Sequence, residues 1–138
     1  MAIPPYSTFS ATSELLVTAA VYYVVWKAYA HGDLRKGMLV TVLAFEAVVN
    51  ISYMAYRFAV PNQALSGAPG WLTSVAVLHG ILSLAMFIGL VFLAALAWRD
   101  DRTGGNFFRE QAPVTWSFVG LWGVSVASGE LLYVGFYL

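Results

Sequence analysis

Four apolar runs, each long enough to cross a lipid bilayer, constrain this chain more than any other feature. A helix that crosses ~30 Å of hydrocarbon needs about 20 mostly apolar residues. The runs cover roughly residues 14–30, 37–58, 71–98 and 114–138. We therefore predict an all-α fold, a four-helix transmembrane bundle in up-down-up-down order, forming a single integral membrane domain over residues 1–138.

The composition supports a membrane protein and excludes several other classes. Hydrophobic residues make up 60% of the chain and charged residues only 10%, whereas about a quarter of the residues are charged in ordinary soluble domains. The formal net charge is zero, so no nucleic-acid partner is predicted. The chain has no cysteine, which excludes disulfides, thiolate metal sites and iron–sulfur clusters.

The basic residues predict how the spans are oriented. Arg57 lies beside the second loop, and the other six flank the first and third loops: Lys27, Arg35, Lys36, Arg99, Arg102 and Arg109. Cytoplasmic loops carry the excess of Lys and Arg, so we place these two loops in the cytoplasm and both termini on the outer side. Residues 1–13 are interpreted as an outer segment, with Ser13 as a helix N-cap and Glu14 in the first turn.

The second run carries a polar stripe within "LAFEAVVNISYMAYR", residues 43–57. Four polar side chains recur there every three or four residues: Glu46, Asn50, Tyr53 and Arg57. This spacing places them along one side of a helix, and the opposite side is apolar. We expect the polar side to be turned away from lipid.

Two further ionisable residues lie well inside predicted spans, His79 in the third and Glu130 in the fourth. Counted from the outer ends of their spans, Asn50, His79 and Glu130 all lie about 12 Å deep. Tyr22 falls at the same depth in the first span. A lone charge at this depth costs at least ~3 kcal/mol, so we expect these groups to converge inside the bundle. His79 could then pair with Glu130, or an acid could stay protonated, since loss of solvent raises the pKa of a carboxyl.

Three uses of this group stay open: a hydrogen-bond network that fixes helix register, a site for a cofactor, quinone or proton, and a contact face for another membrane protein. The candidate cofactor-binding residues are His79, Glu130, Glu46, Asn50, Tyr53 and Tyr22. His79, Glu130 and Glu46 are also candidate ligands for iron, manganese or zinc, although the Glu-x-x-His pair of diiron bundles is missing. Haem held by two histidines is not expected, because His31 and His79 belong to opposite ends of the bundle. Haem held by one histidine, a quinone or a metal ion remain as candidate cofactors.

Small residues recur at four-residue spacing in the last two spans. The pairs are Ala76 with Gly80, and Ser125 with Gly129. Because such pairs let helices approach closely in lipid, we predict helix contacts at both.

The last span, with "WGVSVASGELLY", resembles the closing signature of the CtaM/YozB-like family, small four-span prokaryotic membrane proteins associated with cytochrome oxidase assembly. The matching positions are Trp122, Gly129 and Tyr133, and in the earlier spans Arg35, Met38, Tyr53 and His79. The resemblance covers about residues 34–138. Leu34 and Phe108 stand where the family has histidines, and Glu130 stands at an apolar position. A histidine-rich metal or haem role is therefore not carried over intact.

The resemblance implies a non-catalytic accessory or assembly subunit of a respiratory complex of the cytochrome oxidase type, in the prokaryotic plasma membrane. Its partners would be the lipid bilayer and other membrane subunits or further copies of the chain. The alternative is a small membrane redox or proton-handling protein that binds haem, quinone or a metal through its intramembrane His and Glu residues. No nucleophile–base motif or phosphate loop is present, so an enzyme is not expected.

Overall fold

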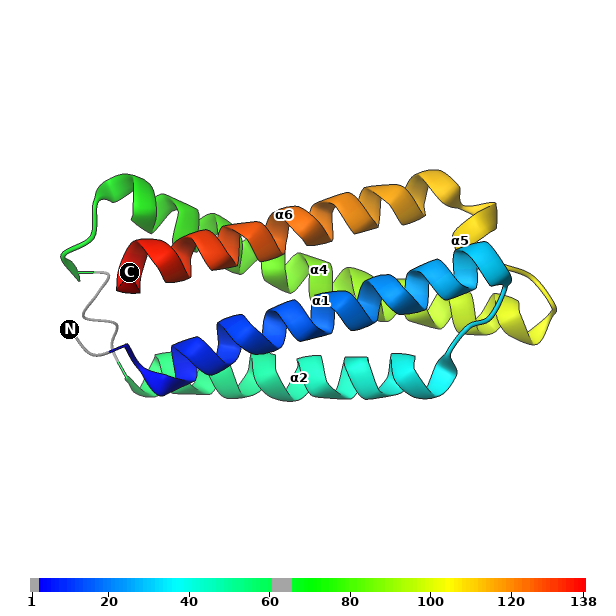
Figure 1. Cartoon of the computed structure of the whole chain (residues 1–138), viewed down its shortest axis with the longest axis horizontal. Coiled ribbons are helices and arrows are strands. Elements are labelled where there is room, and N and C mark those ends of the chain that lie inside the picture. Colours follow the sequence, from blue (N-terminus) through cyan, green and yellow to red (C-terminus); the bar gives the residue numbers. More distant parts are fainter. Residues whose placement is uncertain (1–2, 61–65) are drawn as a thin grey trace.

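The chain folds into four long helices that lie side by side along one axis (Figure 1). The computed structural model describes residues 3–60 and 66–138, and all regular structure in these ranges is helical, without strands. The elements are α1 (Pro5–His31), α2 (Lys36–Ala59), α4 (Gly70–Arg102), the short α5 (Phe107–Glu110) and α6 (Ala112–Tyr137). The four long helices have the length and apolar composition needed to cross a membrane.

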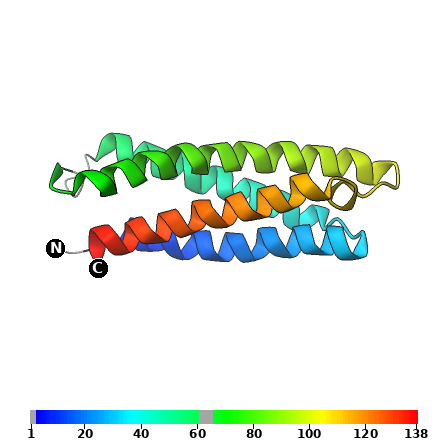
Figure 2. The same ribbon diagram turned by 90° about the horizontal axis from the view of Figure 1, so that it is seen from above.

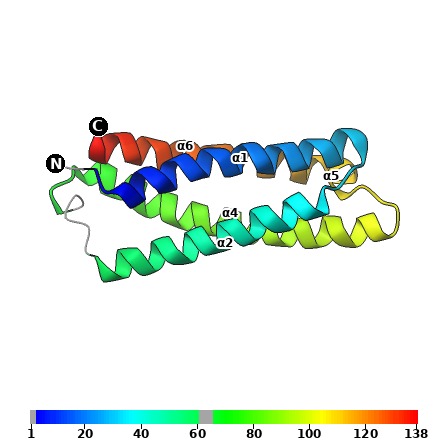
Figure 3. The same ribbon diagram turned by 60° about the horizontal axis from the view of Figure 1, so that its bottom comes forward.

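The long helices form a ring in which α1 packs against α2 and α6, and α4 packs against the same two helices. Figures 2 and 3 show this arrangement from two further sides. Helix α6 runs antiparallel to α1, because Thr8 contacts Tyr133 near one end and Tyr22 contacts Val119 further along. The start of α1 and the end of α6 therefore lie at the same end of the bundle (Figure 1).

The start of α1 differs from the sequence prediction, whereas the other helix ends lie within about four residues of it. Helix α1 begins at Pro5, so residues 5–13 are helical and do not form an outer segment. Proline is favoured at the first helical position because its missing N–H is not needed there. Ser13 is not the N-cap, and its hydroxyl donates within the helix to the Ser10 carbonyl at 2.9 Å. The predicted loop between the second and third spans includes residues 61–65, which lie outside the described residues.

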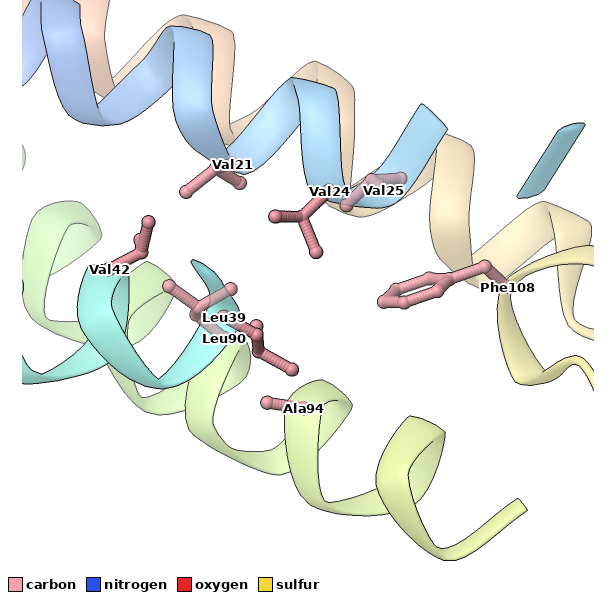
Figure 4. A pocket seen from close by; sticks show the side chains of 8 residues that line it. All are labelled: Val21, Val24, Val25, Leu39, Val42, Leu90, Ala94 and Phe108. Carbon is pink, nitrogen blue, oxygen red and sulfur yellow. The ribbon is translucent and has the colours of Figure 1, made fainter. Parts of the chain in front are cut away.

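The buried apolar core lies mainly in the half of the bundle that contains the α1–α2 connection. Figure 4 shows a small cavity in this core, with side chains from α1, α2, α4 and α5 around it. Its lining residues are Val21, Val24, Val25, Leu39, Val42, Leu90, Ala94 and Phe108. The cavity measures about 10 Å³, close to the space of a single water-sized sphere. Its size and its lack of a polar lining make it a packing gap and not a cofactor site.

Helix α2 is the least buried of the long helices. It buries only Leu39 and Val42, whereas α1, α4 and α6 bury six residues each. Large apolar side chains are exposed along its outside: Phe45, Val48, Ile51, Met54 and Phe58. A surface of this kind suits contact with lipid chains or with another apolar helix.

Helix α5 closes the end of the bundle opposite the termini by satisfying the last carbonyls of α1. The Asn106 amide donates to the Ala28 carbonyl at 2.7 Å, and the Arg109 guanidinium donates to the Tyr29 and Ala30 carbonyls, each at 2.9 Å. The last four carbonyls of a helix have no partner within the helix itself. These contacts therefore fix the position of α5 against α1.

Candidate functional site

His79 on α4 is held by α6 through one ring nitrogen. Its Nδ1 lies 3.1 Å from the Ser125 carbonyl oxygen and 2.9 Å from the Ser128 hydroxyl. The Ser128 hydroxyl itself donates to the Ser125 carbonyl at 2.7 Å. A carbonyl only accepts, so the bonded Nδ1 carries the hydrogen and donates to both oxygens. In the neutral ring, the lone pair is then on Nε2, which is free to accept a proton.

The ring edge of His79 and the Glu14 carboxyl of α1 both approach Gly129 of α6. A methyl group placed on Gly129 would lie 2.8 Å from His79 Cε1, 3.3 Å from His79 Nε2 and 3.0 Å from Glu14 Oε2. Both side chains therefore occupy the space that a side chain at residue 129 would need. Of the two small-residue pairs predicted to mediate contacts, the one containing Gly129 does so, whereas the space beside Gly80 is open.

Further acids face Glu14 from the neighbouring helices. The Glu14 carboxyl lies within electrostatic range of Glu46 on α2 and Glu130 on α6. Asn50 holds Glu46 in place by donating to its carboxylate at 3.0 Å and to its backbone carbonyl at 2.8 Å. We call Glu14, His79, Glu46 and Glu130 the acid–histidine cluster. In it, hydrophilic side chains from all four long helices turn toward a shared region inside the bundle.

Of the two alternatives for Glu130, the pair with His79 is not present as a hydrogen bond among the residues that the structure describes. Within residues 3–60 and 66–138 no hydrogen bond joins these two residues, and the buried Glu130 Oε1 has no hydrogen-bond partner at all. The carboxyl that approaches Gly129 together with the imidazole is that of Glu14. The prediction placed Glu14 in the first turn of its helix and so left it out of the interior.

Tyr22 does not share the layer of His79, in contrast to the prediction. Its hydroxyl donates to the Val119 carbonyl at 2.8 Å, and Val119 lies ten residues from Gly129, or about 15 Å along α6. The depth was counted from residue 14, whereas α1 begins at Pro5. The correction moves the layer back along α1 by about two turns, to Glu14.

Of the remaining residues considered in the sequence, Tyr53 lies near the cluster and His31 lies far from it. Tyr53 lies at the edge of the cluster, within electrostatic range of Glu14, and stacks on Tyr6 with ring centres 6.0 Å apart. His31 is exposed at the opposite end of the bundle, against the ring of Trp26. In the part of the chain that the structure describes, no three His, Asp or Glu side chains are arranged to hold one metal ion. The candidate ligands His79, Glu130 and Glu46 do not form such a group.

Comparisons with known proteins leave the relationships of the chain open. No family model, no curated protein and no solved structure matches it. The resemblance to the CtaM/YozB-like family therefore remains a hypothesis. Its three positions on α6 each have a local role in this fold: Trp122 donates to Thr18 at 3.1 Å, Gly129 makes room for the cluster, and Tyr133 bonds to Thr8 at 2.9 Å.

The sequence analysis missed Glu14 and Ser128 as parts of the site. A signal for Glu14 was present, because Pro5 is a favoured helix start and Glu14, Thr18 and Tyr22 then share one side of the helix at four-residue spacing. Ser128 offered no such signal, because a serine in an apolar span commonly bonds back to its own helix.

Proposed function

We propose that this chain is a small multi-pass membrane protein that holds and exchanges protons at its acid–histidine cluster. The spans run in up-down-up-down order with both termini on the outer side of a prokaryotic plasma membrane. Six of the seven basic residues flank the α1–α2 and α4–α6 connections, and an excess of Lys and Arg is typical of cytoplasmic loops. This orientation places the cluster in the outer half of the membrane.

The approach of Glu14 and His79 to the same glycine, Gly129, is the observation that carries this proposal. Three carboxyls and one imidazole share the region, and no Lys or Arg side chain forms a hydrogen bond or ion pair with any of them among the described residues. Ionising all three carboxyls would place uncompensated negative charges inside the bundle, at a high desolvation and repulsion cost. The cluster therefore favours keeping protons that it can pass between its members.

In the proposed function, one proton moves between Glu14 and His79. The Glu14 O–H bond breaks and an N–H bond forms at Nε2 of His79, which turns a neutral pair into a carboxylate beside an imidazolium. Ser125 and Ser128 keep the Nδ1 hydrogen in place throughout, so the ring needs no rotation. The acids on either side, Glu46 and Glu130, oppose a full negative charge on Glu14 and favour return of the proton.

A lipid-soluble carbodiimide tests the proposal, because such reagents add to a protonated carboxyl and do not react with a carboxylate. We expect the reagent to label Glu14 in the reconstituted protein, with labelling lost at high pH and absent in Glu14→Gln. Glu110→Gln, which changes an exposed acid of α5, serves as the matched control and keeps the label. A Glu14 that stays unlabelled at every pH, while the protein remains folded, would contradict the proposal.

A second candidate function is that of a non-catalytic accessory or assembly subunit of a cytochrome oxidase-type respiratory complex. The low burial of α2 favours this second function. The broad apolar outside of that helix is available to a partner span. The resemblance of α6 supplies the type of complex. Copurification with oxidase subunits from native membrane in mild detergent would support this role, and recovery of the chain alone or only as a homo-oligomer would count against it.

Whether the cluster binds a haem, quinone or metal is tested on the purified protein. An absorption spectrum and metal analysis of the purified protein would reveal a pigment or a stoichiometric metal. Either one, if lost in His79→Ala, would replace proton exchange by redox chemistry as the role of the cluster.

A further inference from the structure

The seam between α1 and α6 is lined with hydroxyl groups from the end of the bundle at which the chain termini lie. Ser7 donates to the Tyr137 hydroxyl at 3.3 Å, and the Thr8 and Tyr133 hydroxyls lie 2.9 Å apart. Ser7, Tyr133 and Tyr137 are partly exposed and Thr8 is exposed. We call these four residues the hydroxyl gate. Hydroxyls both donate and accept hydrogen bonds, so they can relay a proton between water molecules.

The acid–histidine cluster lies directly below this gate along the same seam. Glu14 follows Thr8 by six residues, which is about 9 Å along α1. Glu130 precedes Tyr133 by three residues, which places both on one side of α6. The unpartnered Oε1 of Glu130 lies in this stretch, and an oxygen without a protein partner is a natural contact for water.

Beyond the cluster, the polar groups of the seam are bonded to one another, and apolar side chains then fill it. Trp122 crosses it to reach Thr18, and Tyr22 uses its hydroxyl on the Val119 carbonyl. Past Tyr22 the layers are apolar and tightly buried, with Val25 and Phe118 each at 6% exposure. Figure 4 shows the side chains that line the core there, and the gap they leave is about 10 Å³. The buried side chains that follow Tyr22 on α1 are Val24, Val25 and Ala28, so in the part of the chain that the structure describes they offer no chain of polar groups to carry a proton further.

We propose that the acid–histidine cluster exchanges protons with only one side of the membrane, through the hydroxyl gate at the end of the bundle with the termini. This inference rests on the proposed proton-holding function and adds the route and its direction. The titratable side chains that face Glu14 are His79 from α4, Glu46 and Tyr53 from α2, and Glu130 from α6. Each of them is reached from the gate before the apolar layers begin.

The first test sets the pH on each side of a vesicle membrane separately and reads carbodiimide labelling of Glu14. The chain has no cysteine, so Gly67→Cys allows molecules with that end outward to be captured with an impermeant thiol reagent. We expect a rise in external pH to remove the label from these molecules, and a rise in internal pH to leave it unchanged. A label that follows internal pH, or both sides equally, would overturn the one-sided route. Absence of label under all conditions would contradict the proton-holding function itself.

The second test blocks the gate. In Thr8→Cys, a bulky impermeant thiol reagent should slow the loss of label after an external pH jump by about tenfold or more, equivalent to a barrier about 1.4 kcal/mol higher. Phe9→Cys is the matched control, because Phe9 is the next residue of α1 and is 52% exposed. Equal rates in the two modified variants would show that protons do not pass the gate.

Discussion

At the scale of single residues, Gly129 decides whether the cluster can form. The His79 ring and the Glu14 carboxyl both lie closer to its missing side chain than ordinary packing allows. His79 cannot retreat freely, because its ring is tied to Ser125 and Ser128. Helices that approach over a glycine in lipid gain close packing and interhelical hydrogen bonds, which replace the hydrophobic driving force of water.

We therefore predict that Gly129→Ala destabilises the protein by about 1–3 kcal/mol, the usual cost of overpacking. Thermal unfolding in detergent would measure this as a lower midpoint. Gly80→Ala is the matched control, since a methyl group there meets nothing within 4 Å, and its helix propensity adds up to about 1 kcal/mol of stability. In Gly129→Ala/His79→Ala the loss should be smaller than the sum of the single changes. Similar midpoints for the two glycine variants would contradict the close contact.

The Glu46–Asn50 pair gives a second prediction at this scale. Asn50→Leu removes the donor that satisfies the Glu46 carboxylate, and an unsatisfied buried acceptor costs about 1–3 kcal/mol. Met54→Leu, an exposed change on the same helix, should leave the unfolding midpoint unchanged. An Asn50→Leu variant as stable as the native protein would show that the pair contributes nothing to the fold.

At the scale of helices, the sequence predicted the features that depend on length and periodicity, and it failed where a local choice decided the outcome. The four spans are predicted by runs that only a bilayer-crossing helix explains, and all four are present as helices. The four-residue spacing of Glu46 and Asn50 predicted one side of a helix, and the two side chains do bond to each other. Both conclusions depend on one helix at a time.

The errors had two sources, the point at which α1 begins and the way neighbouring helices face one another. A polar stretch of Ser and Thr before Glu14 was interpreted as an outer segment, although the same residues bond within a helix, as Ser13 does. That error shifted the depth scale of α1, so that Tyr22 was assigned the place of Glu14. The residues that face His79 could not be predicted either, because the depth of a residue in the membrane does not fix how its helix is rotated about its own axis.

The short helix α5 yields a prediction at this scale. Asn106→Ala removes the amide that donates to the Ala28 carbonyl and the side-chain acceptor for the Arg109 N–H. We expect a loss of about 1–2 kcal/mol, the range for a capping side chain, measured as a lower unfolding midpoint. Arg102→Ala, an exposed change in the last residue of α4, is the control. If both variants unfold alike, the capping role of α5 is wrong.

At the scale of the whole molecule, the two ends of the bundle differ in chemistry. One end carries the hydroxyl gate and the acid–histidine cluster, and the other carries the apolar core and most of the basic residues. A bilayer is crossed by a potential and has a cytoplasmic surface that attracts Lys and Arg. Because of this asymmetry, a proton site at one end of the bundle exchanges protons with a defined side of the membrane.

The orientation is the last prediction, and the lack of native cysteine makes it directly testable. Thr103→Cys lies in the connection flanked by Arg99, Arg102 and Arg109, and should be labelled only from the cytoplasmic side. Residue 103 is preferable to Gly104, whose φ of +78° would strain any other residue. Gly67→Cys, before α4, should be labelled only from outside. Labelling of Gly67→Cys only from the cytoplasm, with Thr103→Cys labelled from outside, would invert the bundle. The gate would then open to the cytoplasm, because its position relative to the cluster does not depend on which way the bundle is inserted.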